Sequence, residues 1–225
     1  RTPLTYVTGG FALLAEELET QQAPSTSEDV RVSLDLIQNG TQRLNRLAEQ
    51  MVLYSEIISG YIQSQVAVAS EEVDLEMLVS DALGILLAPA SERKISFHRT
   101  CQSDFPVATY GVRELLVTAT SEVIRNAIQH SPEGSSIELV VARESEFGTI
   151  TVIDHGTGIR PEDQASIWEL LSQADRSRNE QQGVGMGLPI VKGIVTAHNG
   201  DVFLYSVPGV GTEMTLRLPL YPPGT

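Results

Sequence analysis

Three polar residues, Glu122, Asn126 and His130, recur at every fourth position of the segment ELLVTATSEVIRNAIQHS. On an α-helix this spacing places their side chains in a line along one side. The apolar stripe that would face the protein core on the same helix consists of Leu116, Ala119, Val123 and Ala127. Such a polar line can bind a ligand, but an ordinary solvated helix face has the same pattern. The helix alone leaves both interpretations open.

A second candidate site follows in the segment TVIDHGTGI, where an apolar strand is predicted to end at Asp154. Gly156 and Gly158 come directly after it, and residues without a Cβ atom let the backbone turn sharply and approach a ligand closely. A carboxylate at a strand end can accept a hydrogen bond from an exocyclic amine. Many tight turns share this pattern, so it indicates a site only together with other motifs.

Glycines open a third segment, GVGMGLPIVKGIVTAHNG, in which Gly183, Gly185 and Gly187 precede a predicted helix. Amide groups at a helix N-terminus, together with the helix dipole, favour binding of an anion such as phosphate. A dinucleotide-binding fingerprint also contains such glycines, but here no strand precedes them and no acidic residue follows at the required distance. The Lys-Ser/Thr ending of a P-loop is missing as well.

Alternating strands and amphipathic helices are mixed along the second part of the chain. Helices are predicted over residues 75–88 and 113–130, and strands over residues 94–100, 137–143, 148–154, 201–207 and 212–218. Because helices and strands do not alternate regularly, we expect an α/β sandwich with one mixed sheet and helices on one face. With the helical first part, the fold class is α+β.

The first part of the chain carries two heptad seams. Apolar residues recur every three or four positions in 4–18 and again in 34–61, with a Pro-containing break between them. Two antiparallel helices cannot bury this much apolar surface alone, so we expect a homodimeric four-helix bundle. The alternative is a single hairpin packed on the following domain. We expect the hairpin to comprise residues 1–66 and the second domain residues 67–225.

Composition limits the possible partners and compartments. The net charge is −14, with 15 basic against 29 acidic residues, which disfavours nucleic acid but allows a small nucleotide. The single Cys101 excludes an internal disulfide framework and fits a reducing, cytoplasmic compartment. Since no apolar run reaches the length of a membrane span, we expect no membrane contact by these residues, although they could form the cytoplasmic part of a membrane-bound sensor.

Taken in order, the Glu-xxx-Asn helix, the DxGxG turn, the GxGxGL helix start and the GxGT of PGVGT resemble the nucleotide-binding domain of the GHKL (Bergerat-fold) ATPases. The upstream hairpin, the IWELL segment and the stretch PIVKGIVTAHNGDV are similar to a sensor histidine kinase of two-component systems. In that family the hairpin begins with a motif of the form His-Glu-Leu-Arg-Thr-Pro-Leu. The chain reads RTPL from residue 1, so we expect the phosphoacceptor His just upstream of Arg1.

The resemblance implies ATP and Mg²⁺ as ligands. Asp154 would bind the adenine amino group beside Gly156 and Gly158, and Thr212 would hold the same end of the ring. Asn126 would coordinate Mg²⁺, which neutralises phosphate charge in the transfer.

Further roles follow from the same resemblance. Glu122 would be the general base for the acceptor imidazole, and His130 would lie near the phosphates. Gly183, Gly185 and Gly187 would anchor a lid from which Arg178 reaches the γ-phosphate. Thr2 would orient a water for dephosphorylation of the regulator.

These expectations predict a kinase core that phosphorylates a His on the hairpin and passes the phosphoryl group to an Asp of a response-regulator receiver domain. It could also act as a phosphatase of that regulator. Two alternatives remain open at this point: a non-enzymatic nucleotide-binding scaffold, and another GHKL ATPase that hydrolyses ATP without a phosphoprotein. The complete set of Glu122, Asn126, Asp154 and glycines favours the kinase over the scaffold, and the heptad hairpin with the RTPL segment argues against the other ATPase.

Overall fold

A computed structural model describes residues 27–170 and 185–221 of the chain. Contacts between residues divide the chain into two compact units, residues 1–52 and 53–225. Each unit is described by itself. Among the described residues, none of the helices is long and apolar enough to cross a membrane.

Helix α2 (Ser27–Ile58) contains the second heptad seam. In the first unit, Leu44 and Met51 on this seam expose 61% and 62% of their surface. The helix ends before Gly60, which adopts a left-handed φ of 77°, and α3 (Tyr61–Ala69) follows. The seam was expected to continue through Tyr61, but the left-handed residue breaks the helix there. The first helix of the expected hairpin lies outside the described residues.

A mixed five-stranded sheet forms the centre of the second unit, with the strand order β2-β4-β5-β7-β6. Its strands are β2 (Ser96–Gln102), β4 (Ser136–Glu144), β5 (Phe147–Asp154), β7 (Gly211–Pro219) and β6 (Asp201–Val207). The β2–β4 pair is parallel and the other pairs are antiparallel, which confirms the predicted mixed sheet. A separate two-stranded sheet of β1 (Glu71–Asp74) and β3 (Ala108–Gly111) was not predicted.

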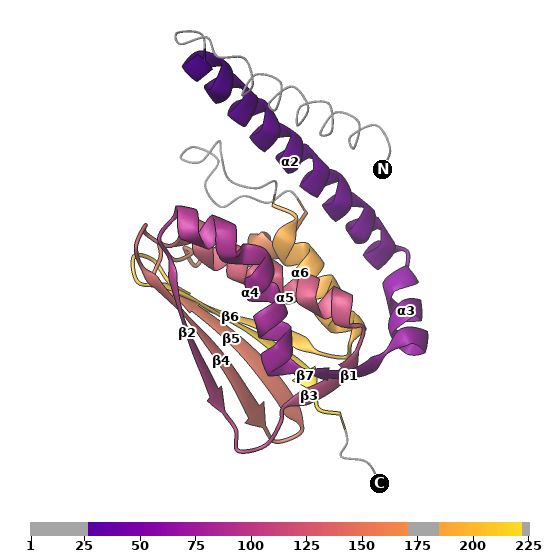
Figure 1. The fold of residues 1–225 in the computed structure, drawn as a ribbon. Coiled ribbons are helices and arrows are strands. Elements are labelled where there is room, and N and C mark those ends of the chain that lie inside the picture. The colour runs from indigo at the N-terminus through magenta and orange to yellow at the C-terminus, as the bar shows by residue number, and fades with distance from the viewer. Residues whose placement is uncertain (1–26, 171–184, 222–225) are drawn as a thin grey trace. The chain divides into compact units, whose positions relative to one another are not determined.

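Helices cover one face of the five-stranded sheet, as expected for an α/β sandwich (Figure 1). They are α4 (Leu75–Glu92), α5 (Arg113–His130) and α6 (Gly187–Ala197), with the short 3-10 helix η1 (Ser166–Trp168) preceding α6. Apolar side chains from these helices and from the strands form one core, in which Leu116, Ile150 and Ile190 are almost completely buried. Burial of this apolar layer is the main force that holds α5 and α6 on the sheet.

On the face of the sheet opposite the helices, the side chain of Arg217 on β7 contacts side chains of both neighbouring strands. Its guanidinium lies 4.5 Å from the ring centre of Phe147 on β5 and 4.7 Å from that of Phe203 on β6. The same side chain donates a hydrogen bond of 2.6 Å to Asp201 at the start of β6. Cation–π contacts and this ion pair thus join three adjacent strands on this face.

The buried side chain of His198 connects the start of α5 to α6 through hydrogen bonds. Its Nε2 atom accepts the backbone N–H of Val112, the N-cap residue of α5, at 3.0 Å. Because that N–H can only donate, the ring hydrogen must be on Nδ1, which donates to the carbonyl of Ile194 in α6 at 2.8 Å. Burial lowers the pKa of His198 and favours this neutral ring.

Candidate functional site

Helix α5 carries the predicted polar line of Glu122, Asn126 and His130, and its observed bounds match the predicted range of 113–130. The Glu122 side chain is only 12% exposed and has Arg125 Nε 3.5 Å from its Oε1 atom. Asn126 is half-buried. Within residues 27–170 and 185–221, no side chain or backbone group forms a hydrogen bond with the Asn126 amide, so its oxygen is available to a ligand.

The carboxylate of Asp154 is buried at the end of β5, with 7% of the residue exposed. Its Oδ1 atom accepts the backbone N–H groups of Gly156 at 2.9 Å and Thr212 at 3.2 Å. Thr212 is the direct partner of Asp154 in the β5–β7 register. In the described part of the chain no group donates to Oδ2, which leaves this oxygen to accept an N–H group of a ligand.

Burial raises the pKa of Asp154, while the two backbone hydrogen bonds and the nearby His130 and His155 oppose this shift. The pKa of His130 is lowered by burial and by Arg93, against the opposing influence of Asp154. The site therefore combines a carboxylate that has lost much of its hydration with an imidazole that favours its neutral form.

The loop after Asp154 packs against the C-terminal end of α5. The N–H group of Thr157 donates to the His130 carbonyl at 3.3 Å. A Cβ atom on Gly156 would collide with that same carbonyl, so only glycine permits this close approach. The end of the polar helix face is thereby fixed beside the Asp154 carboxylate.

The other end of that helix face meets the start of α6. Gly187 is the first residue of α6, and a Cβ atom on it would come within 2.7 Å of Glu122 Oε2. Met186 occupies the N-cap position and forms no side-chain cap, so within the part of the chain that the structure describes the first-turn N–H groups of α6 can bind an anion. Gly185, two residues before the helix, has a φ of 74°.

The predicted glycine Gly158 adopts a φ of 64° where the loop passes the backbone of Val207. Three other predicted site residues, Thr2, Arg178 and Gly183, lie outside the described residues. Among the described residues, no group of three His, Cys, Asp or Glu side chains could hold a metal ion. The Asn126 oxygen is of the type that a divalent ion prefers, and it could serve as a ligand together with oxygens of a bound nucleotide.

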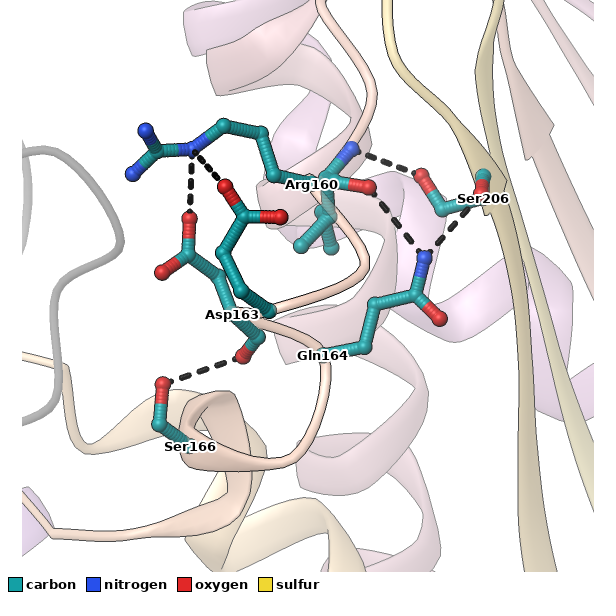
Figure 2. Close-up of polar contacts among 7 residues, drawn as sticks. Arg160, Asp163, Gln164, Ser166 and Ser206 are labelled. Carbon is teal, nitrogen blue, oxygen red and sulfur yellow. Dashed lines mark hydrogen bonds and ion pairs between the residues drawn. The ribbon is translucent and has the colours of Figure 1, made fainter.

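Sequence reasoning missed Ser206 and Gln164, which hold the loop after Asp154 in place. Ser206 Oγ accepts the N–H of Ile159 at 2.8 Å, and Gln164 donates to the carbonyls of Ile159 and Ser206 (Figure 2). Ser206 could have been found, because it takes an inward position in the alternating strand DVFLYSV where Val202 and Leu204 also point inward. We find no sequence signal for Gln164.

Comparisons with known proteins agree with this geometry. Residues 111–222 match the family described as histidine kinase-, DNA gyrase B-, and HSP90-like ATPases. The chain is 32% identical over 212 residues to the sensor-like histidine kinase SenX3 of Mycobacterium tuberculosis, an alignment that covers 94% of this chain and 50% of SenX3. The chain thus spans about half the length of this curated relative.

Two solved structures share the fold. The mycobacterial sensor histidine kinase MprB superposes with a TM-score of 0.60 at 24% identity, covering 68% of this chain and 99% of that one. Full-length ShkA in complex with AMPPNP superposes with a TM-score of 0.74 at 19% identity, covering 99% of this chain and 46% of that one. Residues 111–222 therefore belong to the histidine kinase-, DNA gyrase B- and HSP90-like ATPase family, and the chain carries the ATP-binding catalytic domain of a sensor histidine kinase.

Proposed function

We propose that the chain is an ATP-dependent protein-histidine kinase core, which phosphorylates a His on the helical hairpin and passes the phosphoryl group to an Asp of a response regulator. One observation carries this proposal. One end of the polar face of α5, at His130, lies beside the buried Asp154 carboxylate. The other end, at Glu122, lies beside the N-terminus of α6, where the N-cap residue forms no side-chain cap. This face spans about 12 Å along the helix axis.

The two ends of this face fit the two ends of ATP. Asp154 Oδ2 would accept the amino group of adenine, with Thr212 beside it, and Gly156 and Gly158 would let the loop approach the ring. The first-turn amides of α6 would bind the phosphates, with Gly185 and Gly187 at their start. We place Gly183 and Arg178 in the same phosphate-binding segment. His130 was expected near the phosphates, but its end of α5 packs against the loop after Asp154, so we place it nearer the base.

Asn126 would hold Mg²⁺ through its amide oxygen, and the ion would neutralise charge on the phosphates during transfer. Glu122 would accept the proton of the acceptor imidazole while an imidazole nitrogen attacks the γ-phosphorus. The bond from the γ-phosphorus to the bridging oxygen then breaks, and ADP leaves. Positioning and charge stabilisation provide most of the rate enhancement in such transfers.

The partners are proposed from the first part of the chain. The exposed seam residues Leu44 and Met51 would be covered by a second copy, so that residues 1–66 form a homodimeric four-helix bundle and residues 67–225 the catalytic domain. A receiver domain would dock against this bundle, where Thr2 would orient a water for the phosphatase reaction. These residues would act in the cytoplasm.

The test is phosphate incorporation from γ-labelled ATP with Mg²⁺ into a chain in which His-Glu-Leu precedes Arg1. We expect an acid-labile, base-stable label that is lost when this His is replaced by Ala or Asn126 by Asp. If ATP binds but no label forms in the unchanged chain, the kinase proposal is wrong and a nucleotide-binding scaffold replaces it. Release of phosphate without a labelled protein would instead indicate an ATPase.

A further inference from the structure

The side chain of Ser206 joins three backbone segments next to the proposed base site. Its Oγ atom accepts the N–H of Ile159 at 2.8 Å and lies 3.0 Å from the carbonyl oxygen of Gly211. The hydroxyl oxygen of Thr212 lies 2.9 Å away. Ser206 is buried, with 9% of the residue exposed, so these contacts are not readily exchanged for water.

The direction of the hydrogen bond between the two hydroxyl groups follows from these contacts. A hydroxyl group has one hydrogen to donate and can accept two hydrogen bonds. The carbonyl of Gly211 can only accept, so Ser206 must give its single hydrogen to that oxygen. All three contacts are satisfied only if Thr212 donates its own hydrogen to Ser206. Ser206 then makes one donated and two accepted bonds, its full capacity.

Thr212 consequently has no hydrogen left for a ligand, and its Oγ1 atom can only accept. In the β5–β7 register Thr212 lies directly opposite Asp154, so the two side chains are on the same face of the sheet. The backbone N–H of Thr212 also donates to Asp154 Oδ1. The hydroxyl oxygen and the carboxylate therefore stand side by side as two acceptors.

Gln164 keeps Ser206 in this position. Its side-chain amide donates to the carbonyl of Ile159 at 3.2 Å and to that of Ser206 at 3.1 Å, which fastens the loop to β6 (Figure 2). An ion pair between Arg160 and Asp163 and a hydrogen bond from Ser166 to the Asp163 carbonyl hold the next turn of the loop. These contacts keep the N–H group of Ile159 in its hydrogen bond to Ser206 Oγ.

We propose that Ser206 determines the specificity of the site for a base that carries an amino group, because it takes up the only hydrogen of Thr212 and presents Thr212 Oγ1 and the Asp154 carboxylate as paired acceptors. This inference rests on the proposed nucleotide site. An amino group offers two N–H donors to such a pair, whereas a carbonyl oxygen in its place would face acceptors only. Ser206 is a positioning residue that acts through Thr212.

The experiment compares the Kd of ATP with that of purine riboside triphosphate, which lacks only the amino group. The ratio of the two constants isolates the contribution of that group. We expect the unchanged chain to prefer ATP by roughly 100-fold. Ser206→Ala frees the Thr212 hydroxyl and should lower this ratio by about five- to tenfold, since one acceptor is no longer fixed. Ser206→Thr keeps a hydroxyl group and should retain the ratio.

A second pair of variants separates this role from a purely structural one. In a Thr212→Val background, Ser206→Ala should leave the ratio unchanged, because the group through which it acts is gone. A lowered ratio in that background, or an unchanged ratio in Ser206→Ala alone, would overturn the inference while ATP binding itself stands. If Ser206→Ala does not fold by circular dichroism, Ser206→Cys replaces it with the same expectations. Should the unchanged chain bind neither nucleotide, the proposed function fails and this inference with it.

Discussion

Glu122 and Gly187 are so close that a Cβ atom on Gly187 would come within 2.7 Å of Glu122 Oε2. The atom in the way is the far end of a flexible side chain, so Gly187→Ala would displace the carboxylate and leave the core unchanged. We expect the free energy of unfolding to stay within about 0.5 kcal/mol. Misplacement of the proposed base should slow phosphotransfer roughly 10- to 100-fold, with a much smaller change in ATP affinity.

Thermal unfolding, ATP titration and the labelling assay measure these three effects. Gly84→Ala is the matched control, since nothing lies within 4 Å of a Cβ atom at this position inside α4. It should stabilise the helix by about 0.5–1 kcal/mol without changing phosphotransfer. Equal losses of rate in both variants would rule out a specific contact between Gly187 and Glu122.

Replacing Asp154 by Asn should separate binding from stability. The Asn Oδ1 atom can still accept the N–H groups of Gly156 and Thr212, and the cost of burying a charge disappears. We expect the variant to unfold at the same temperature as the unchanged chain or higher at pH 7, yet to lose ATP binding, because its amide NH₂ opposes the amino group of adenine. The exposed Asp104→Asn is the control, with no change in ATP affinity. A strongly destabilised Asp154→Asn would contradict this reading of the site.

The raised pKa of Asp154 also predicts how binding depends on pH. ATP needs the ionised carboxylate as an acceptor, so its affinity should fall as pH decreases toward the raised pKa, at a higher pH than an ordinary Asp would require. Titration of ATP affinity by calorimetry between pH 5 and 8 measures this loss. An affinity that rises on acidification in this range would exclude Asp154 as the acceptor.

Asn126→Ala tests the metal role without disturbing the fold. Because no described residue forms a hydrogen bond with this side chain, we expect little change in the unfolding temperature. Phosphotransfer should fall at least about 100-fold, since a bound metal ion contributes several kcal/mol to charge stabilisation. ATP affinity should also lose its dependence on added Mg²⁺. Glu114→Gln, on an exposed position of the same helix, should keep both properties.

His198 predicts a pH dependence of stability. Its pKa in the folded chain is below the unfolded value of about 6.5, so the unfolded state binds more protons in between. The stability that depends on the neutral ring is complete above pH 6.5 and is lost as pH falls toward the lowered pKa. His198→Phe leaves the Val112 N–H unpaired and should cost about 1–3 kcal/mol at pH 7.5.

His198→Gln is the informative comparison. Its amide can accept from Val112 and donate to Ile194 without titrating, so this variant should keep most of the stability and lose the pH dependence that the unchanged chain shows below the unfolded pKa of His. Urea unfolding at several pH values gives both quantities. The same acid-induced loss in His198→Gln as in the unchanged chain would assign that loss to other groups.

The elements that were predicted correctly are those whose formation depends on a local sequence pattern alone. Helix α5 has its predicted bounds because its apolar stripe is complete and Pro132 follows its end. By contrast, the pairing of β1 with β3 joins two four-residue segments that are far apart in the chain, and neither is long enough to show a period. Helix α4 was predicted to stop before Pro89 but continues to Glu92, because one missing hydrogen bond near a helix end is tolerated.

The residues of the candidate site also divide into those that a local motif reveals and those that only the fold brings together. Asp154, Asn126 and the glycines could be identified because their motifs lie in short, ordered segments of the sequence. Ser206 acts through Ile159 on one side and Thr212 on the other, and only the folded hairpin brings these groups together. Roles that depend on contacts between distant segments cannot be derived from spacing along one segment.

The position of Arg217 affects how readily the domain aggregates. Strand β6 is one of the two edge strands of the sheet, and an unpaired edge can template pairing with another chain. The guanidinium over Phe147 and Phe203 places a hydrated charge on the apolar rings next to that edge. A second sheet stacking on this face would have to dehydrate this charge, so Arg217 opposes aggregation through the face beside β6.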